Sequence, residues 1–273
     1  MMQTLIPKKN VNDWLCVNKL SLNIKKTKYM IFRFPQTRMN PHLNLNINGV
    51  TIEQVKEFKF LGTLIDETLS WNAHVTYICR KVSRNLGILK RSRKYLPQPV
   101  LLQLYNSLIM SHLTYSLSIW GFNNSRLFKI QKKAIRIISN SKYNAHTDPL
   151  FKNFNFLKLQ DLFYLSLLKL YYKYRHDNLP GYFSNIFKPK QTTHQYPTRN
   201  RNPIFHIPKK NSSKKSLRFH IPKLLQKTPP CIVDKISTHS YDGFCNYAKN
   251  HLISQYKNVC VVQNCYICGT TNV

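Results

Sequence analysis

The chain has 273 residues, of which 42% are apolar, so it is long enough to bury the core of one large or two modest domains. Its formal charge is +32, because 42 lysines and arginines face only 10 aspartates and glutamates. Self-repulsion of this size opposes compaction unless a polyanion screens it, so the charge argues against an ordinary neutral surface and predicts a polyanionic partner. The alternative is a solvated basic surface that only keeps the chain soluble.

The cysteine content and the N-terminal sequence predict an intracellular protein, nuclear or cytoplasmic. The seven cysteines are odd in number, which argues against a disulfide framework, and residues 1–9 contain no apolar secretory segment. No stretch approaches the ~18 consecutive apolar residues that cross a bilayer. Secretion and a membrane partner are therefore not expected.

The first predicted elements are a short helix within residues 11–26 and a strand at residues 28–34, which Pro35 ends. Apolar and polar residues then alternate through residues 43–52, on both sides of Asn48-Gly49. This pattern predicts a β-hairpin with a type I′ turn.

Aromatic and branched residues from Phe58 to Ile65 form an apolar run that Gly62 interrupts. The run predicts a buried strand with a bend, which would join the hairpin in a small antiparallel sheet. Ser70 or Asn72 can cap the helix that follows.

Helices are predicted from residue 72 onward, because apolar residues recur there at helical spacing. Such faces must pack on one another, so a helical bundle is expected. The segments are 72–95, 100–119, 125–138 and a longer one that begins near Pro149, with its apolar face at 159–174.

The C-terminal part is predicted to be less regular. Residues 178–233 contain no acidic side chain and many prolines, which favours an extended basic strap with short apolar anchors, one of them at residues 219–222. A helix at residues 240–256 and a cysteine-bearing tail follow. The candidate zinc ligands are Cys260, Cys265 and Cys268, with His251, Cys245 or Cys231 as the fourth, and free thiols are the alternative.

Basic side chains recur along the predicted helices 72–95 and 125–138, and no acid occurs from Thr68 to Thr147. Phosphate groups are the natural partners of such faces, although solvated helix faces are the alternative. Phe128 and Tyr143 lie close enough in sequence to stack on bases. The candidate phosphate-binding residues are Arg80, Lys81, Arg84, Lys90, Arg91, Arg93, Lys94, Arg126, Lys129, Lys132, Lys133 and Arg136.

Several short motifs occur in a fixed order along the chain. Phe60-Leu61-Gly62 is followed by Ile65-Asp66 and Leu69-Ser70-Trp71. The others are Trp14-Leu15, Asn18 to Asn23, Lys26-Thr27-Lys28, Met30 to Phe32, Leu104-Tyr105, Leu113 to Tyr115, Trp120-Gly121, Gln131 to Arg136, Ala145-His146, Pro149 to Phe151 and Tyr196 to Arg199. In order and spacing, these motifs resemble the reverse transcriptases of non-LTR retrotransposons, in particular the jockey-like group.

The resemblance implies an α+β fold, with a small antiparallel sheet at the end of a polymerase palm, a helical thumb-like bundle and an irregular basic tail. Phe60, Leu61 and Gly62 would hold the primer terminus. Lys26 would match a lysine that helps to protonate pyrophosphate, and a solvated lysine is the alternative. The implied regions are residues 1–71 for the palm end, 72–177 for the thumb-like region, 178–233 for the strap and 234–273 for the helix and tail.

A polymerase needs two metal ions held by clustered carboxylates. In the resembling family these aspartates lie upstream of the segment that matches Asn18 to Asn23. The one adjacent acidic pair here, Asp66-Glu67, fits a turn at a helix start better than a metal site. An intact parent would use Mg²⁺, but this chain alone is expected to hold no catalytic metal and to bind nucleic acid without synthesis.

The predicted function is that of a C-terminal fragment of an RNA-directed DNA polymerase that binds template–primer nucleic acid. RNA, an RNA–DNA hybrid or DNA would be its partner. Two alternatives remain: a basic nucleic-acid packaging protein and a retroelement relic without a function.

Overall fold

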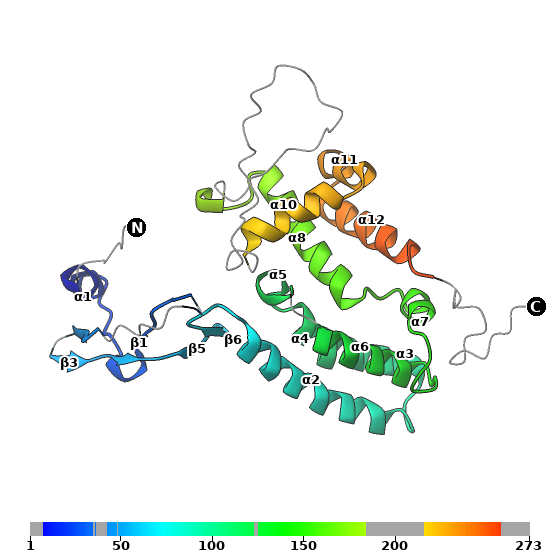
Figure 1. The fold of residues 1–273 in the computed structure, drawn as a ribbon, viewed down its shortest axis with the longest axis horizontal. Coiled ribbons are helices and arrows are strands. Elements are labelled where there is room, and N and C mark those ends of the chain that lie inside the picture. Colours follow the sequence, from blue (N-terminus) through cyan, green and yellow to red (C-terminus); the bar gives the residue numbers. More distant parts are fainter. Residues whose placement is uncertain are drawn as a thin grey trace, which may run out of the picture. The chain divides into compact units, whose positions relative to one another are not determined.

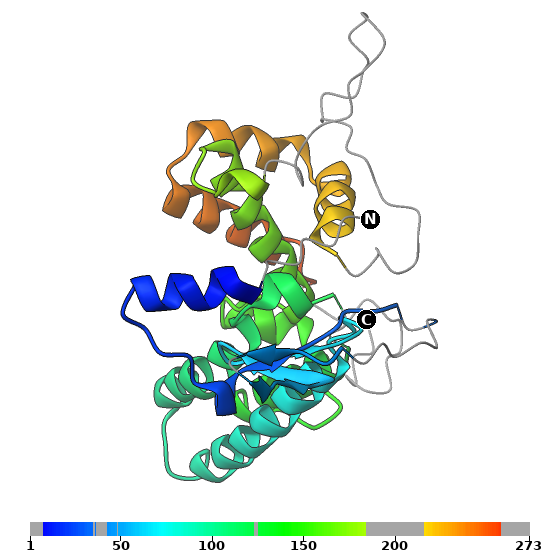
Figure 2. The ribbon, with the colours of Figure 1, turned by 90° about the vertical axis from the view of Figure 1, so that its left-hand side faces the viewer.

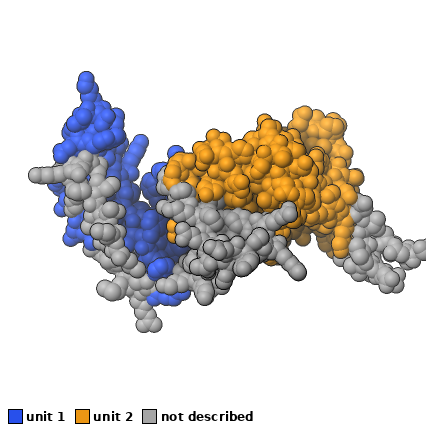
Figure 3. Space-filling model, turned by 90° about the horizontal axis from the view of Figure 1, so that it is seen from above, with its two compact units in different colours: residues 1–74 blue, residues 75–273 orange. Residues whose placement is uncertain are grey.

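The computed structural model describes residues 8–34, 36, 43–47, 49–122, 125–183 and 216–257. The chain divides into two compact units, residues 1–74 and residues 75–273, which Figure 3 shows in blue and orange. In the described part, the chain is mostly helical with small sheets, which agrees with the predicted α+β class. Within the same residues, no helix is both long and apolar enough to cross a membrane.

The first unit contains helix α1 (Lys8–Val17), a 3-10 helix η1 (Ile24–Lys26) and short strands. Among its described residues, the strands form separate two-stranded sheets (Figure 1). β1 (Lys28–Tyr29) pairs in parallel with β4 (Glu53–Gln54), whereas β2 (Asn46–Ile47) pairs antiparallel with β3 (Val50–Thr51), and β5 (Glu57–Phe60) pairs antiparallel with β6 (Thr63–Asp66).

The hairpin within residues 43–52 is confirmed, because Asn46 faces Thr51 and Ile47 faces Val50. Gly49 has the positive φ, 78°, that a type I′ turn requires, while Asn48 lies outside the described residues. The prediction of one continuous antiparallel sheet was wrong. Local alternation cannot show which segments pair, and here residues 28–29 pair in parallel with residues 53–54.

The prediction of a single buried strand at residues 58–65 was also wrong. Leu61 and Gly62 have φ values of 44° and 83°, which turn the chain between β5 and β6 in a two-residue loop. Positive φ at both central positions is the signature of a type I′ turn. β5 is exposed along its length, whereas β6 is buried at Thr63 and Asp66, so the apolar run forms a hairpin with one exposed strand.

The described part of the second unit is helical (Figure 1). The N-terminal group comprises α2 (Asn72–Ser92), whose first turn belongs to the first unit, α3 (Gln98–Tyr105), the π-helix η2 (Asn106–Met110), α4 (Ser111–Thr114), α5 (Leu117–Trp120), α6 (Ser125–Ile138) and α7 (Asp148–Asn153). The C-terminal group comprises α8 (Leu159–Arg175), the 3-10 helix η3 (Gly181–Phe183), α10 (Leu217–Lys227), α11 (Pro230–Thr238) and α12 (Tyr241–Ser254).

The predicted helix at residues 100–119 is interrupted. It passes through η2 into α4, and Ser116 then adopts a left-handed conformation with φ 51° before α5 begins. The Trp120 indole Nε1–H donates to the Tyr115 carbonyl at 3.0 Å, which satisfies an acceptor at the break. The break packs tightly, because a Cβ on Gly121 would lie 2.6 Å from both the Leu117 carbonyl oxygen and Phe163 of α8. Trp120 and Gly121 therefore both contribute to the packing at this break.

Helix α8 forms the centre of the helical unit and contacts α4, α5, α6, α10 and α12. Figures 1 and 2 show α10, α11 and α12 packed beside α8, and the contacts of α12 and the segment that follows it extend from Tyr172 near the C-terminal end of α8 to Asp161 near its N-terminal end. The side chains of Leu167, Leu168 and Tyr171 are at most 2% exposed. The predicted packing of several amphipathic helices is therefore confirmed for the described residues.

Two predictions for the C-terminal region had different outcomes. Residues 217–227 form helix α10 rather than part of an irregular strap, because Ile221, Leu224 and Leu225 form an apolar face that is buried. Residues 184–215 of the predicted strap lie outside the described residues. The predicted helix at 240–256 is confirmed as α12, whose N-cap Ser240 accepts a hydrogen bond from the Gly243 amide.

Candidate nucleic-acid interface

Helix α2 has one apolar face and one basic face. Its apolar residues Val75, Ile78, Val82 and Leu89 are at most 5% exposed. Arg80, Arg84 and Arg91 recur at spacings of four and seven residues, which places them on one opposite, exposed face. We refer to these three arginines as the α2 basic face.

Further cations surround this face. Lys90, Arg93 and Lys94 are exposed at the C-terminal end of α2. Lys81 is half-buried, and its Nζ lies 4.9 Å from the centre of the Tyr77 ring. In the part of the chain that the structure describes, no acidic side chain forms an ion pair with any of these cations. Their charges are therefore available to an external anion.

Gly87 lies between Arg84 and Arg91 on the α2 basic face, and a Cβ at this position would have no atom within 4 Å. A mid-helix glycine costs roughly 0.5–1 kcal/mol relative to alanine. We predict that Gly87→Ala raises the free energy of unfolding by about this amount in chemical denaturation. A lower stability would show that Gly87 has a packing role.

Helix α6 presents a second set of cations, but they are not equivalent. Lys129 and Lys133 are exposed, whereas the Lys132 Nζ lies 4.8 Å from the centre of the Phe128 ring. The Arg136 Nε–H donates to the Ala145 carbonyl at 2.8 Å, and burial lowers the pKa of Arg136. Arg136 therefore holds the turn after α6, and its side chain is less available to phosphate than those of the lysines.

The two aromatic residues proposed for stacking also differ. Phe128 is half-buried and stacks on Phe151, with the ring centres 6.4 Å apart. Tyr143 is 89% exposed in the turn between α6 and α7. Only Tyr143 of this pair presents an open ring face.

The Phe60-Leu61-Gly62 motif forms the tip of the β5–β6 hairpin. Phe60 is 55% exposed and Leu61 is 75% exposed, so the tip presents apolar side chains and a glycine to the outside. This exposure leaves the backbone of Gly62 approachable. The geometry fits a contact with another molecule better than a place in a core.

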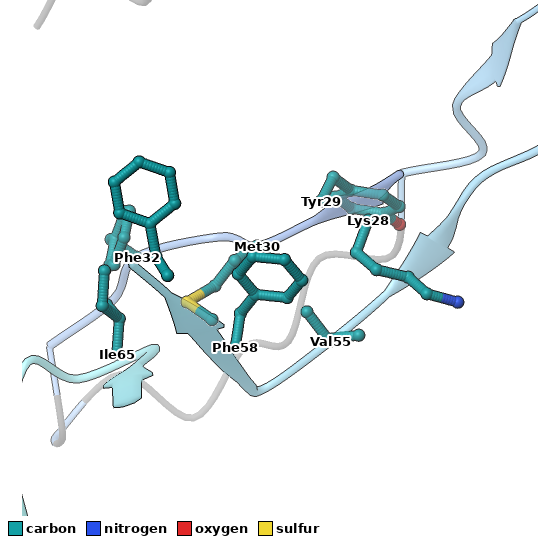
Figure 4. A pocket seen from close by; sticks show the side chains of 8 residues that line it. Lys28, Tyr29, Met30, Phe32, Val55, Phe58 and Ile65 are labelled. Atoms are coloured by element: carbon teal, nitrogen blue, oxygen red, sulfur yellow. The ribbon is translucent and has the colours of Figure 1, made fainter. Parts of the chain in front are cut away.

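A shallow pocket of about 150 Å³ lies beside this hairpin in the first unit (Figure 4). Apolar and aromatic side chains make up most of its wall, and one lysine, Lys28, completes it. The apolar and aromatic residues of the wall are Tyr29, Met30, Phe32, Val55, Phe58, Phe60 and Ile65. Among the described residues that line the pocket there is no carboxylate.

Asp66 fixes the turn that leads into α2. Its carboxylate accepts hydrogen bonds from Thr68 Oγ1 at 2.6 Å and from the Ser70 and Trp71 amides, both at 3.0 Å. Leu69 and Trp71 both have positive φ in this turn. Burial alone would raise the pKa of Asp66, but these hydrogen bonds outweigh it, so the pKa lies below its ordinary value.

The neighbouring acid is also engaged. Arg33 Nη2 lies 2.5 Å from Glu67 Oε1, and this hydrogen bond lowers the pKa of Glu67. Within the described residues, no group of three or more histidines, cysteines, aspartates and glutamates is arranged to hold a metal ion. The Asp66 and Glu67 carboxylates are thus both held by contacts within the first unit.

The remaining predicted site residues belong to other elements. Lys26 is exposed at the end of η1, where its amide bonds to Asn23. His251 of α12 stacks with Tyr247, with the ring centres 6.4 Å apart. Cys260, Cys265 and Cys268 lie outside the described residues, so the zinc site stays a prediction.

Sequence reasoning missed two buried polar residues. His74 is fully buried, and its Nδ1 accepts a hydrogen bond from the Leu64 amide at 3.2 Å, which ties β6 to the start of α2. Burial lowers the pKa of His74. Gln131 is equally buried in α6, four residues after Leu127 on the apolar face. A polar residue at this position of an apolar helix stripe is the sequence signal that could have identified Gln131 as buried.

The comparisons with known proteins give one distant relative. The chain is 26% identical over 160 residues to a protein described as a probable RNA-directed DNA polymerase from transposon X-element of Drosophila melanogaster. The match covers 56% of this chain but 17% of the relative. No family model and no solved structure matches. The similarity supports a relationship to a region of a retrotransposon reverse transcriptase.

Proposed function

We propose that this chain is the C-terminal part of a reverse transcriptase from a non-LTR retrotransposon of the jockey-like group, and that it holds the template–primer nucleic acid. The distant similarity to a transposon polymerase supports the class of protein. The order of motifs around Phe60-Leu61-Gly62 supports the placement next to a primer grip.

The observation that carries the proposal is the α2 basic face. Three arginines project from one side of a helix whose other side is buried, and the region from Thr68 to Thr147 contains no acid that could neutralise them. Guanidinium groups donate hydrogen bonds in a planar fork that matches phosphate oxygens. A sugar-phosphate backbone is the ligand that this face fits.

The adjacent acids Asp66 and Glu67 do not fit a magnesium pair. The Asp66 carboxylate already accepts three hydrogen bonds, and Glu67 is paired with Arg33. We therefore derive no catalytic step from them. The chain is expected to bind a primed template and, when purified alone, not to extend the primer with Mg²⁺ and deoxynucleotides.

We predict that replacing Arg80, Arg84 and Arg91 together with glutamine weakens binding to a recessed RNA–DNA hybrid. Each lost phosphate contact should reduce the slope of log affinity against log salt by about 0.9 for a duplex. The measurement is a titration of a labelled hybrid at several salt concentrations. Because the three side chains are exposed, the variant should unfold as the wild type does.

A matched control removes the same charge elsewhere. Arg218, Lys227 and Lys257 are exposed cations of the C-terminal region, and their triple glutamine variant has the same net charge as the α2 variant. It should keep most of the wild-type slope. Equal losses in both variants would show that binding depends on net charge alone and would contradict a defined interface.

A nucleic-acid packaging protein is the rival function. The affinity of a packaging protein should not depend on a primer terminus. A primer-holding fragment, in contrast, should bind a recessed hybrid more tightly than a single strand of equal length. Equal affinity for both ligands would favour the packaging function.

A further inference from the structure

Tyr95 and Tyr143 are the two most exposed large apolar side chains in the described part of the chain. Tyr95 is 83% exposed and Tyr143 is 89% exposed. By contrast, Tyr105, Tyr171 and Tyr172 are at most 5% exposed. The two exposed rings therefore contribute little to the core.

Both tyrosines are held on well-defined turns. The amides of Tyr95 and Leu96 donate to the Ser92 carbonyl at 3.0 Å, between the end of α2 and the start of α3. In the second turn, the Ala145 amide donates to the Lys142 carbonyl at 3.1 Å, and this places Tyr143 at the tip. The hydrogen bond from Arg136 Nε to Ala145 fixes that turn on α6.

The two turns lie at the same end of the helical unit. Gln98, three residues after Tyr95, donates from Nε2 to the carbonyl of Ile138 at 3.3 Å. Figure 1 shows the end of α2 and the connection from α6 to α7 at this end. The exposed cations Arg91, Arg93, Lys94 and Lys142 belong to the same segments.

We propose that Tyr95 and Tyr143 form a stacking site for unpaired bases of a single-stranded nucleic acid. Aromatic rings on a positively charged surface bind single strands, because any base can stack on a ring while the phosphates contact the cations. A ring on a fixed turn loses little conformational freedom on binding. This inference rests on the proposed function and adds a site for unpaired bases to the contacts of the α2 basic face with phosphates.

The test compares two strands with the same number of phosphates, one with bases and one abasic. The wild type should bind the strand with bases about tenfold more tightly for each stacked tyrosine. The double variant Tyr95→Ala with Tyr143→Ala should lose that preference, and the double phenylalanine variant should keep it. RNA and DNA strands should respond alike, because both present the same base faces.

Lys94→Gln is the matched control, because it removes a phosphate contact next to Tyr95. It should weaken binding of the strand with bases and of the abasic strand by the same factor. If the wild type binds both strands equally, or if the double alanine variant keeps the wild-type preference, the stacking site is wrong. In either case, a salt-dependent affinity that needs the α2 basic face would leave the proposed function standing.

Discussion

Gln131→Leu is expected to lower the free energy of unfolding of the helical unit by about 3 kcal/mol or more. The Gln131 side chain is fully buried and forms three hydrogen bonds. Its Nε2 donates to the Tyr105 hydroxyl at 3.1 Å and to the Leu157 carbonyl at 3.0 Å, and its Oε1 accepts from the Leu159 amide at 2.8 Å.

These hydrogen bonds join α3, α6 and the start of α8. Leucine has a similar size but cannot form hydrogen bonds, so the Leu157 carbonyl and the Leu159 amide would remain buried without a partner. Each such group costs about 1–3 kcal/mol. Burial already raises the pKa of Tyr105, so its hydroxyl stays neutral and continues to need a hydrogen-bond partner.

Chemical denaturation followed by helical circular dichroism measures the effect, because the helical unit dominates that signal. Gln103→Leu is the matched control, since Gln103 is exposed on α3 and the same substitution there should change stability by less than ~0.5 kcal/mol. Tyr105→Phe removes one of the three hydrogen bonds and should have an intermediate effect of about 1 kcal/mol. Equal stabilities of the two leucine variants would exclude a structural role for Gln131.

The sequence predicted those elements whose own residues determine them. Helix α2 has a complete apolar stripe with Val82 and Leu89, and helix α12 has a serine N-cap, so both were predicted close to their observed bounds. The Asn48-Gly49 hairpin was predicted because its turn requires positive φ, which glycine adopts easily. In each case the conformation that the local residues favour is the one that the folded chain adopts.

Other features depend on contacts between distant residues, and local patterns could not show them. The run from Phe58 to Ile65 is apolar enough for a core strand, yet the turn at Leu61 and Gly62 divides it into a hairpin whose first strand is exposed. The predicted basic faces group cations by helical spacing, but spacing could not show that Arg136 bonds to Ala145. Tyr95 had no neighbouring motif, and only its exposure identified it.

The same distinction applies to Asp66. In the sequence it stands next to Glu67 and could be part of a catalytic pair, but in the structure its carboxylate accepts hydrogen bonds from the turn before α2. Asp66→Ala is expected to destabilise the first unit by about 3 kcal/mol, because the buried Trp71 amide and the Ser70 amide lose a charged acceptor. Asp66→Asn should cost less, since its amide oxygen can still accept one of these bonds.

The lowered pKa of Asp66 gives this prediction a pH dependence. The unfolded chain takes up the proton at the ordinary carboxyl pKa, whereas the folded chain takes it up at a lower pH. The stabilising contribution is therefore complete above the ordinary value and is lost as the pH falls through the lowered one. The difference in stability between the wild type and Asp66→Asn should shrink over that acidic range.

Amide hydrogen exchange at Ser70 and Trp71 is the direct measurement, because both amides donate to Asp66. Exchange should become faster at both positions in Asp66→Ala. In Glu67→Gln, which removes the neighbouring charge and weakens the partly exposed pair with Arg33, it should change little. If Asp66 were instead a metal ligand, exchange would be unchanged in Asp66→Ala and magnesium would stabilise the wild type alone. Slow exchange that depends on Asp66 without magnesium would identify the carboxylate as the acceptor that holds the turn before α2.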